Sequence, residues 1–319
     1  MKKNLKIIGI NILVLPLLLL ITEFAIWKIE GIKLTKETNE IQNLKFHEEI
    51  NQYRLEPQFF PDISRNYGRL PEGLEYPSKP IVLFGCSYTY GYNLEQEETL
   101  QYKLAKITKR PVYNQAFTGW GPQHMLYQTE LDSFYEKIPE PEYVIYTLID
   151  DHVRRAYLMS FCAANFLHET INLRYKEKNG KLVEIKNTNP LLRFIRRLYL
   201  TNEINQLFVK HYISKEENQE KCYDFLFKHI RQSKENMEKR WESTKYVVLI
   251  YNTGKIKETK FLKQKLEKEK FIVLDTHQLT TERLFERKYM QINYHPTEDA
   301  WDLLTPLIVE QLEEKWKSY

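Results

Sequence analysis

Five short apolar runs, separated by stretches of helical character, constrain the fold of this 319-residue chain more than any other feature. They span residues 81–84, 112–114, 143–149, 246–251 and 271–274. Apolar runs without polar alternation are typical of strands that are buried on both faces. Their alternation with helices predicts an α/β fold with a parallel sheet. In such a sheet we expect the functional site at the carboxyl ends of the strands.

Composition excludes several classes of protein. Hydrophobic residues make up 42% of the chain and charged residues 28%, which suits a globular domain and argues against wholesale disorder. The 47 basic and 43 acidic residues are interspersed, so we expect no nucleic-acid partner. Cys86, Cys162 and Cys222 show no C-x-x-C spacing and indicate no disulfide framework. No metal-ligand spacing or glycine-rich phosphate loop occurs, so we expect no metal and no cofactor.

The amino-terminal segment 1–28 decides the expected compartment. Two lysines precede a mostly apolar run, Leu5 to Trp27, that is long enough to cross a bilayer. A signal peptide is the alternative, but no small-x-small cleavage site follows the run. We therefore expect a single-pass membrane anchor with its amino terminus in the cytoplasm and the rest of the chain outside. The polar residues 29–78 then form a stalk that merges into the folded domain.

The first motif that carries chemistry follows the run at 81–84. The sequence GCSYTYG, residues 85–91, ends that run, and a helix is predicted from about Thr99 to Lys109. A serine between a parallel strand and a helix lies where backbone N–H groups can stabilise an anion. Ser87 is therefore the candidate nucleophile. Ordinary turn chemistry is the alternative, because Gly-x-Ser turns are common.

Polar loops follow the next two predicted strands. The run at 112–114 leads into NQAFTGWGP, in which Gly119 lies five residues after Asn114. The run at 143–149 ends in Asp150-Asp151-His152, and two arginines follow. For the segment that contains Gly119, a plain Gly-Pro loop without a catalytic role is the alternative. An arginine near an acidic pair most often serves as its structural partner.

A histidine near the carboxyl terminus is the candidate base. His295 lies in the sequence NYHPT, directly before a helix predicted from Glu298 to Trp316. Histidine takes up and returns a proton near neutral pH. Asn293 could orient the imidazole but cannot stabilise its cation as a carboxylate would. Asp275 and Glu298 are alternative acids for that role.

These four blocks, in this order, resemble those of SGNH (GDSL-like) hydrolases, including membrane-anchored bacterial members. The resemblance covers about residues 80–155 and 245–316. It implies a flavodoxin-like three-layer α/β/α sandwich with a parallel sheet. It also implies Ser87 as nucleophile, His295 as base and the Gly119 N–H as an oxyanion donor.

Three positions depart from the family pattern. Cys86 stands where the family usually has Asp, and Ile292 where one form of the pattern has the Asp that supports the histidine. Asp150 stands where the family has an Asn that donates to the oxyanion, although a carboxylate can only accept. Either Asp150 is protonated, or the backbone donors of Ser87 and Gly119 act alone.

The predicted catalytic domain spans 79–319 and contains an insertion at about 156–241. This segment is rich in Lys, Arg, Tyr and Phe, and we expect it to be largely helical and near the rim of the site. Its basic piece LLRFIRRL, residues 191–198, either packs on the domain as a solvated helix or lies on a membrane surface.

The sequence predicts a serine ester hydrolase that acts on O-acyl groups of cell-envelope glycans or on other acylated small molecules. An O-acyltransferase would use the same residues. A non-catalytic glycan-binding or assembly protein on a degenerate fold is the contrasting class, and the three departures motivate it. No oligomeric state is indicated.

Overall fold

The computed structural model describes residues 79–158, 175–184, 216–251 and 259–316, apart from 282, 285, 292 and 293. All of them belong to one of the two compact units of the chain. The predicted anchor 1–28, the predicted stalk 29–78 and the basic piece 191–198 lie outside the described residues. Among the helices of the described part, none combines the length and the apolar character that crossing a bilayer requires.

Five parallel strands form one sheet in the order β2-β1-β3-β6-β7. Their bounds are Ile81–Phe84 (β1), Val112–Asn114 (β2), Tyr143–Leu148 (β3), Lys245–Ile250 (β6) and Ile272–Asp275 (β7). Each agrees with a predicted apolar run to within one residue at either end, so the predicted parallel α/β sheet is confirmed. The order is the one found in flavodoxin-like sheets, whose direction of winding reverses between the strands that correspond to β1 and β3.

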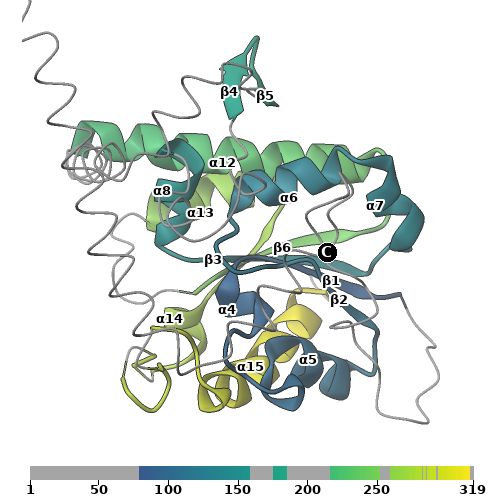
Figure 1. The fold of residues 1–319 in the computed structure, drawn as a ribbon, viewed down its shortest axis with the longest axis vertical. Coiled ribbons are helices and arrows are strands. Elements are labelled where there is room, and N and C mark those ends of the chain that lie inside the picture. Colours follow the sequence, from purple (N-terminus) through teal and green to yellow (C-terminus); the bar gives the residue numbers. More distant parts are fainter. Residues whose placement is uncertain are drawn as a thin grey trace, which may run out of the picture. The chain divides into compact units, whose positions relative to one another are not determined.

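Helices cover both faces of the sheet (Figure 1). One layer consists of α6 (Pro122–Thr129), α7 (Asp132–Lys137), α8 (Asp151–Leu158), α12 (Glu216–Glu238) and α13 (Thr259–Lys268). The other consists of α4 (Ser87–Tyr90), η1 (Gln96–Glu98), α5 (Leu100–Thr108), α14 (Thr276–Leu279) and α15 (Glu298–Trp316). The helices predicted after residues 99 and 298 are α5 and α15.

Side chains from both faces of each central strand are buried, which explains the unbroken apolar runs. Ile81 and Leu83 of β1 pack in a cluster with Leu104 of α5 and Trp301 of α15. Phe84 points to the opposite layer and packs against Phe134 of α7, with ring centroids 5.8 Å apart.

The predicted insertion contributes a hairpin and a helix to the described structure. Strands β4 (Tyr175–Lys178) and β5 (Lys181–Glu184) pair antiparallel across Asn179 and Gly180, which both have positive φ, as a type I′ turn requires. The Gln232 side chain of α12 bonds both backbone groups of Leu182. Because α12 leads directly into β6 and lies in a helix layer of the sandwich, this end of the segment 156–241 belongs to the main fold.

Candidate active site

The structure brings the predicted nucleophile and the predicted base together. Ser87 is the first residue of α4, which begins shortly after the end of β1, and His295 lies in the loop before α15. Their Oγ and Nε2 atoms are 2.8 Å apart, although 208 residues separate them along the chain. This is a hydrogen-bond distance. Ser87 is only 5% exposed, so little of its side chain is accessible to solvent.

Backbone and side-chain hydrogen bonds fix the loop that carries His295. The Gln291 N–H donates to the His295 carbonyl at 2.7 Å. The side-chain amide of Gln291 donates to the carbonyls of Pro296, at 2.9 Å, and Tyr92, at 3.2 Å. The Tyr88 hydroxyl donates to the Tyr294 carbonyl at 2.6 Å. These bonds tie the histidine loop to the segment that follows Ser87.

Aromatic rings surround the imidazole of His295. The rings of Tyr88 and Tyr92 lie 5.5 Å and 4.9 Å from it, centroid to centroid. The adjacent Tyr294 is 74% exposed and has a φ of 63°, a conformation that costs a non-glycine residue about 1 kcal/mol or more. The surrounding hydrogen bonds must therefore hold this conformation in place.

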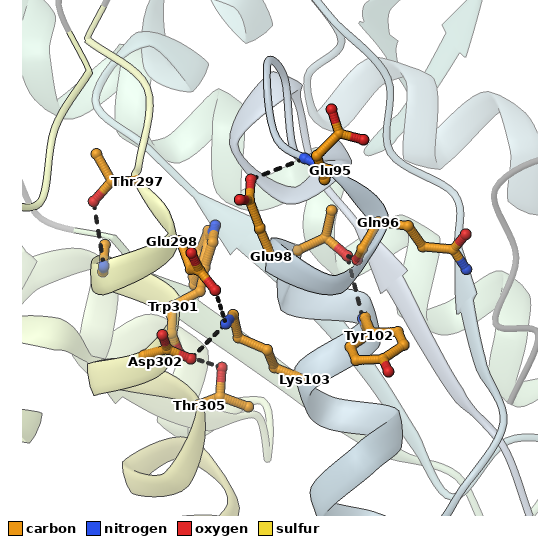
Figure 2. A network of polar contacts seen from close by, with 12 residues as sticks. Glu95, Gln96, Glu98, Tyr102, Lys103, Thr297, Glu298, Trp301, Asp302 and Thr305 are labelled. Carbon is orange, nitrogen blue, oxygen red and sulfur yellow. Dashed lines mark hydrogen bonds and ion pairs between the residues drawn. The ribbon is translucent and has the colours of Figure 1, made fainter. Parts of the chain in front are cut away.

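An ion-pair network anchors the start of α15 (Figure 2). Lys103 of α5, whose side chain is 11% exposed, donates to Glu298 at 3.4 Å and to Asp302. Glu298 lies three residues after His295, so the network connects the end of the histidine loop to α5. The Thr297 hydroxyl also accepts the Ala300 N–H at 3.4 Å, at the first turn of the helix.

The two alternative acids from the sequence each have another partner in the described structure. Glu298 pairs with Lys103. Asp275 accepts the N–H of His277 at 3.0 Å and caps α14. Asn293, the third candidate for orienting the imidazole, lies outside the described residues.

Gly119 lies in a turn that leaves its amide available. The Trp120 N–H donates to the Phe117 carbonyl at 3.1 Å, and Gly119 has a φ of 80°, as the third position of a type II turn requires. Within the described part of the chain, no group accepts the Gly119 N–H. The Asn114 side chain, at the end of β2, donates to the Thr89 carbonyl at 2.9 Å and thereby ties this loop to α4.

Asp150 lies two residues after the end of β3, directly before α8. Burial raises the pKa of Tyr88, and the charges of Cys86 and Asp150 raise it further. The acidic pair also has the arginine partner that its sequence suggests. Arg155 Nε donates to Asp151 Oδ2 at 2.7 Å.

Cys86, which replaces the usual Asp, is fully buried before Ser87. Burial raises the pKa of its thiol, so it stays protonated at neutral pH and is a poor nucleophile. Among the described residues, no group of His, Cys, Asp and Glu side chains could hold a metal ion.

No local pattern singled out Tyr88 or Gln291 as residues that hold the histidine loop. Their partners Tyr294 and Tyr92 lie 206 and 199 residues away along the chain. Only the parallel sheet, which brings the ends of its strands together, creates these contacts.

No protein-family model and no curated protein matches this sequence. Its structural neighbours are SGNH/GDSL lipolytic proteins and family-two carbohydrate esterases. A putative lipolytic protein of the G-D-S-L family from Desulfitobacterium hafniense DCB-2 is 13% identical, with a TM-score of 0.42 over 73% of this chain and 99% of its own. A G-D-S-L lipolytic protein from Veillonella parvula DSM 2008 is 12% identical, with a TM-score of 0.42 over 72% and 96%. A family-two carbohydrate esterase from Clostridium thermocellum, solved with cellohexaose, is 8% identical, with a TM-score of 0.42 over 78% and 66%.

Proposed function

We propose that this chain is a serine ester hydrolase with Ser87 as nucleophile and His295 as general base. The observation that carries the proposal is the 2.8 Å contact between Ser87 Oγ and His295 Nε2. Nucleophile and base within hydrogen-bond reach are the geometric signature of this chemistry. The site also lies after β1, beside the reversal of winding where open α/β sheets bind ligands.

The reaction proceeds in two steps, acylation of Ser87 and then hydrolysis of the acyl-serine. Ser87 Oγ attacks the ester carbonyl, its proton passes to His295 Nε2, and the carbonyl oxygen becomes an oxyanion. The N–H groups of Ser87 and Gly119 stabilise that charge. The C–O bond to the alcohol then breaks, and the alcohol leaves with the proton from His295. Water attacks the acyl-serine by the same route, which releases the acid and restores Ser87.

For the substrate, we infer O-acyl groups on cell-envelope glycans. The predicted anchor at 1–28 supports a location outside the membrane. Tyr294, exposed beside His295, presents a flat apolar face with a polar hydroxyl, which suits a sugar ring. Transfer of the acyl group to a glycan hydroxyl, in place of water, would use the same residues.

The test uses the full-length chain with p-nitrophenyl acetate and with a fluorophosphonate probe. We expect hydrolysis of the ester and a probe adduct that mass spectrometry locates at Ser87. Ser87→Ala should lose both, whereas Ser133→Ala, on α7, should lose neither. Probe labelling elsewhere, with unchanged turnover in Ser87→Ala, would overturn the proposal.

The same assay separates the alternative functions. Acyl transfer to an added glycan without release of free acid would identify a transferase. Glycan binding with neither hydrolysis nor transfer would identify a non-catalytic binding protein.

A further inference from the structure

The peptide group between Trp120 and Gly121 is held from both sides. The Arg155 guanidinium donates to the Trp120 carbonyl. The Gly121 N–H donates to His124 Nδ1 at 3.1 Å. Because both polar groups of one planar unit are engaged, the unit cannot rotate without breaking a buried hydrogen bond. This peptide group lies two peptide units after the one that carries the Gly119 N–H.

Arg155 is itself fixed in place. Its Nε donates to Asp151 at 2.7 Å, and its side chain is 10% exposed. Gly121 allows the close approach, since a Cβ there would lie 3.2 Å from Arg155 Cβ and 2.8 Å from Gln123 Oε1. The backbone of Gly121 is extended, so contact and not conformation requires a glycine.

His124 supplies one half of a capping box, because Gly121 has no side chain to accept a bond in return. It is the third residue of α6, the position from which Glu or Gln commonly accepts the N–H of the N-cap residue, here Gly121. Its ring stacks on the indole of Trp120, with centroids 5.1 Å apart and planes inclined by 3°. The ring therefore has two separable contributions, an acceptor nitrogen and a flat packing surface.

We propose that Arg155 and His124 are positioning residues that hold the Gly119 amide where the oxyanion forms. This inference rests on the proposed ester hydrolysis. An oxyanion donor lowers the barrier only when it is aligned before the reaction begins. A clamped peptide on one side and the Phe117 to Trp120 turn bond on the other fix that alignment. Asp151 contributes by orienting Arg155, which gives the acidic residue after β3 a role without direct contact with substrate.

Paired substitutions separate the acceptor from the ring. His124→Phe keeps the flat ring but loses the acceptor, whereas His124→Gln keeps an acceptor suited to the capping box. Arg155→Met keeps much of the apolar packing of Arg155 and loses its donors. Arg240→Met is the control, because Arg240 also pairs with an aspartate, Asp132. Arg240 lies between α12 and the amino-terminal end of β6, whereas Ser87 follows the carboxyl end of the parallel strand β1.

We expect His124→Phe and Arg155→Met to lower kcat for p-nitrophenyl acetate by roughly 10- to 100-fold. KM should change less than about threefold, because the oxyanion exists only in the transition state. His124→Gln keeps an acceptor, and Arg240 is not part of the clamp. The kcat of both variants should therefore stay within about threefold of the unsubstituted value. In hydrogen-exchange mass spectrometry, the peptide covering 117–124 should exchange faster in His124→Phe and Arg155→Met only.

Unchanged kcat in both clamp variants would overturn the inference, as would a His124→Gln variant as slow as His124→Phe. Faster exchange with normal kcat would show a purely structural clamp and would equally overturn it. If His124→Phe does not fold, the comparison of kcat between Arg155→Met and Arg240→Met tests the inference by itself. If the unsubstituted chain is inactive, the proposed ester hydrolysis is overturned. If the unsubstituted chain is active and the clamp variants are equally active, only the inference about the clamp is overturned.

Discussion

Tyr88 donates its hydroxyl hydrogen to the carbonyl oxygen of Tyr294 at 2.6 Å, across 206 residues of sequence. Tyr88 adjoins the proposed nucleophile and Tyr294 adjoins the proposed base. Burial raises the pKa of Tyr88, so the phenol remains a donor across the range in which an ester hydrolase would work. This hydrogen bond is one of those that set the position of the base relative to the nucleophile.

Tyr88→Phe should slow ester hydrolysis several-fold and lower the free energy of unfolding by roughly 1 kcal/mol. The ring stays in place against Tyr251, whose centroid lies 5.3 Å away, so only the hydroxyl is lost. Tyr92→Phe is the matched control. Steady-state kinetics and thermal melts measure both effects, and equal kinetics in the two variants would exclude a role for the Tyr88 hydroxyl.

Ser87→Ala and His295→Ala should each abolish hydrolysis, and the double variant should be hardly slower than either single one. A nucleophile and its base act as a unit, so their losses do not add. Ser87→Ala should keep its stability within about 1 kcal/mol, because it removes a single hydroxyl and the net contribution of one hydrogen bond is of that size. His277→Ala, an exposed histidine on α14, is the control. Additive losses in log kcat would show that the two residues contribute independently.

Lys103→Met should lower the free energy of unfolding by roughly 1 kcal/mol, because its acidic partners Glu298 and Asp302 are half exposed and solvent screens the ion pairs. It should also slow hydrolysis, since the network anchors the helix that follows His295. Lys106→Met, an exposed lysine on the same helix, should do neither. A melting temperature as unaffected as that of Lys106→Met would refute the stabilising role.

Glu140 makes stability depend on pH in the acid range. The Ser243 backbone N–H, together with Lys79, lowers the pKa of this carboxyl from 4.5 to about 2. A lowered pKa in the folded state stabilises the protein above pH 4.5, and this stabilisation is lost as the pH falls toward 2.

Glu140→Gln should therefore melt at a lower temperature than the unsubstituted chain at pH 7, and the difference should shrink below about pH 4. Glu136→Gln, on α7, should show no such trend. Hydrolysis should be unaffected, because Glu140 precedes β3 at the amino-terminal edge of the sheet, opposite the site. A pH-independent difference between the two melting temperatures would contradict the assignment.

Whether Asn293 orients the imidazole of His295 can be tested by substitution. Asn293→Asp should change the rate or the pH profile of hydrolysis more than Asp299→Asn does, because a carboxylate beside the imidazole stabilises its cation. If the two substitutions act alike, Asn293 has no part in orienting the base.

The strands and the two flanking helices could be predicted because each depends on its own sequence. The run 81–84 is apolar throughout because both faces of β1 are covered. The sequence predicts α12 as part of the insertion, because its many charged residues mask the apolar positions that face the core, such as Leu226 and Ile230. Periodicity detects a helix more reliably than it identifies the layer to which the helix belongs.

The proposed site was predictable only in part. Ser87, Gly119 and His295 stand in recognisable local contexts, at strand ends and before helices. The residues that hold them do not. Arg155 bonds a carbonyl 35 residues away, and nothing near Arg155 in the sequence indicates that contact. Interactions of this kind follow from which strands are neighbours, which local propensity does not encode.

The order of the chain also matters during its synthesis. Ser87 leaves the ribosome 208 residues before His295, which at about 5–20 residues per second corresponds to roughly 10–40 s. Throughout that interval the nascent polypeptide has a serine without a base. Truncated or half-translated products would therefore be inert toward esters in the compartment where translation takes place. In the proposed mechanism, activity would begin only when α15 has emerged and packed against α5.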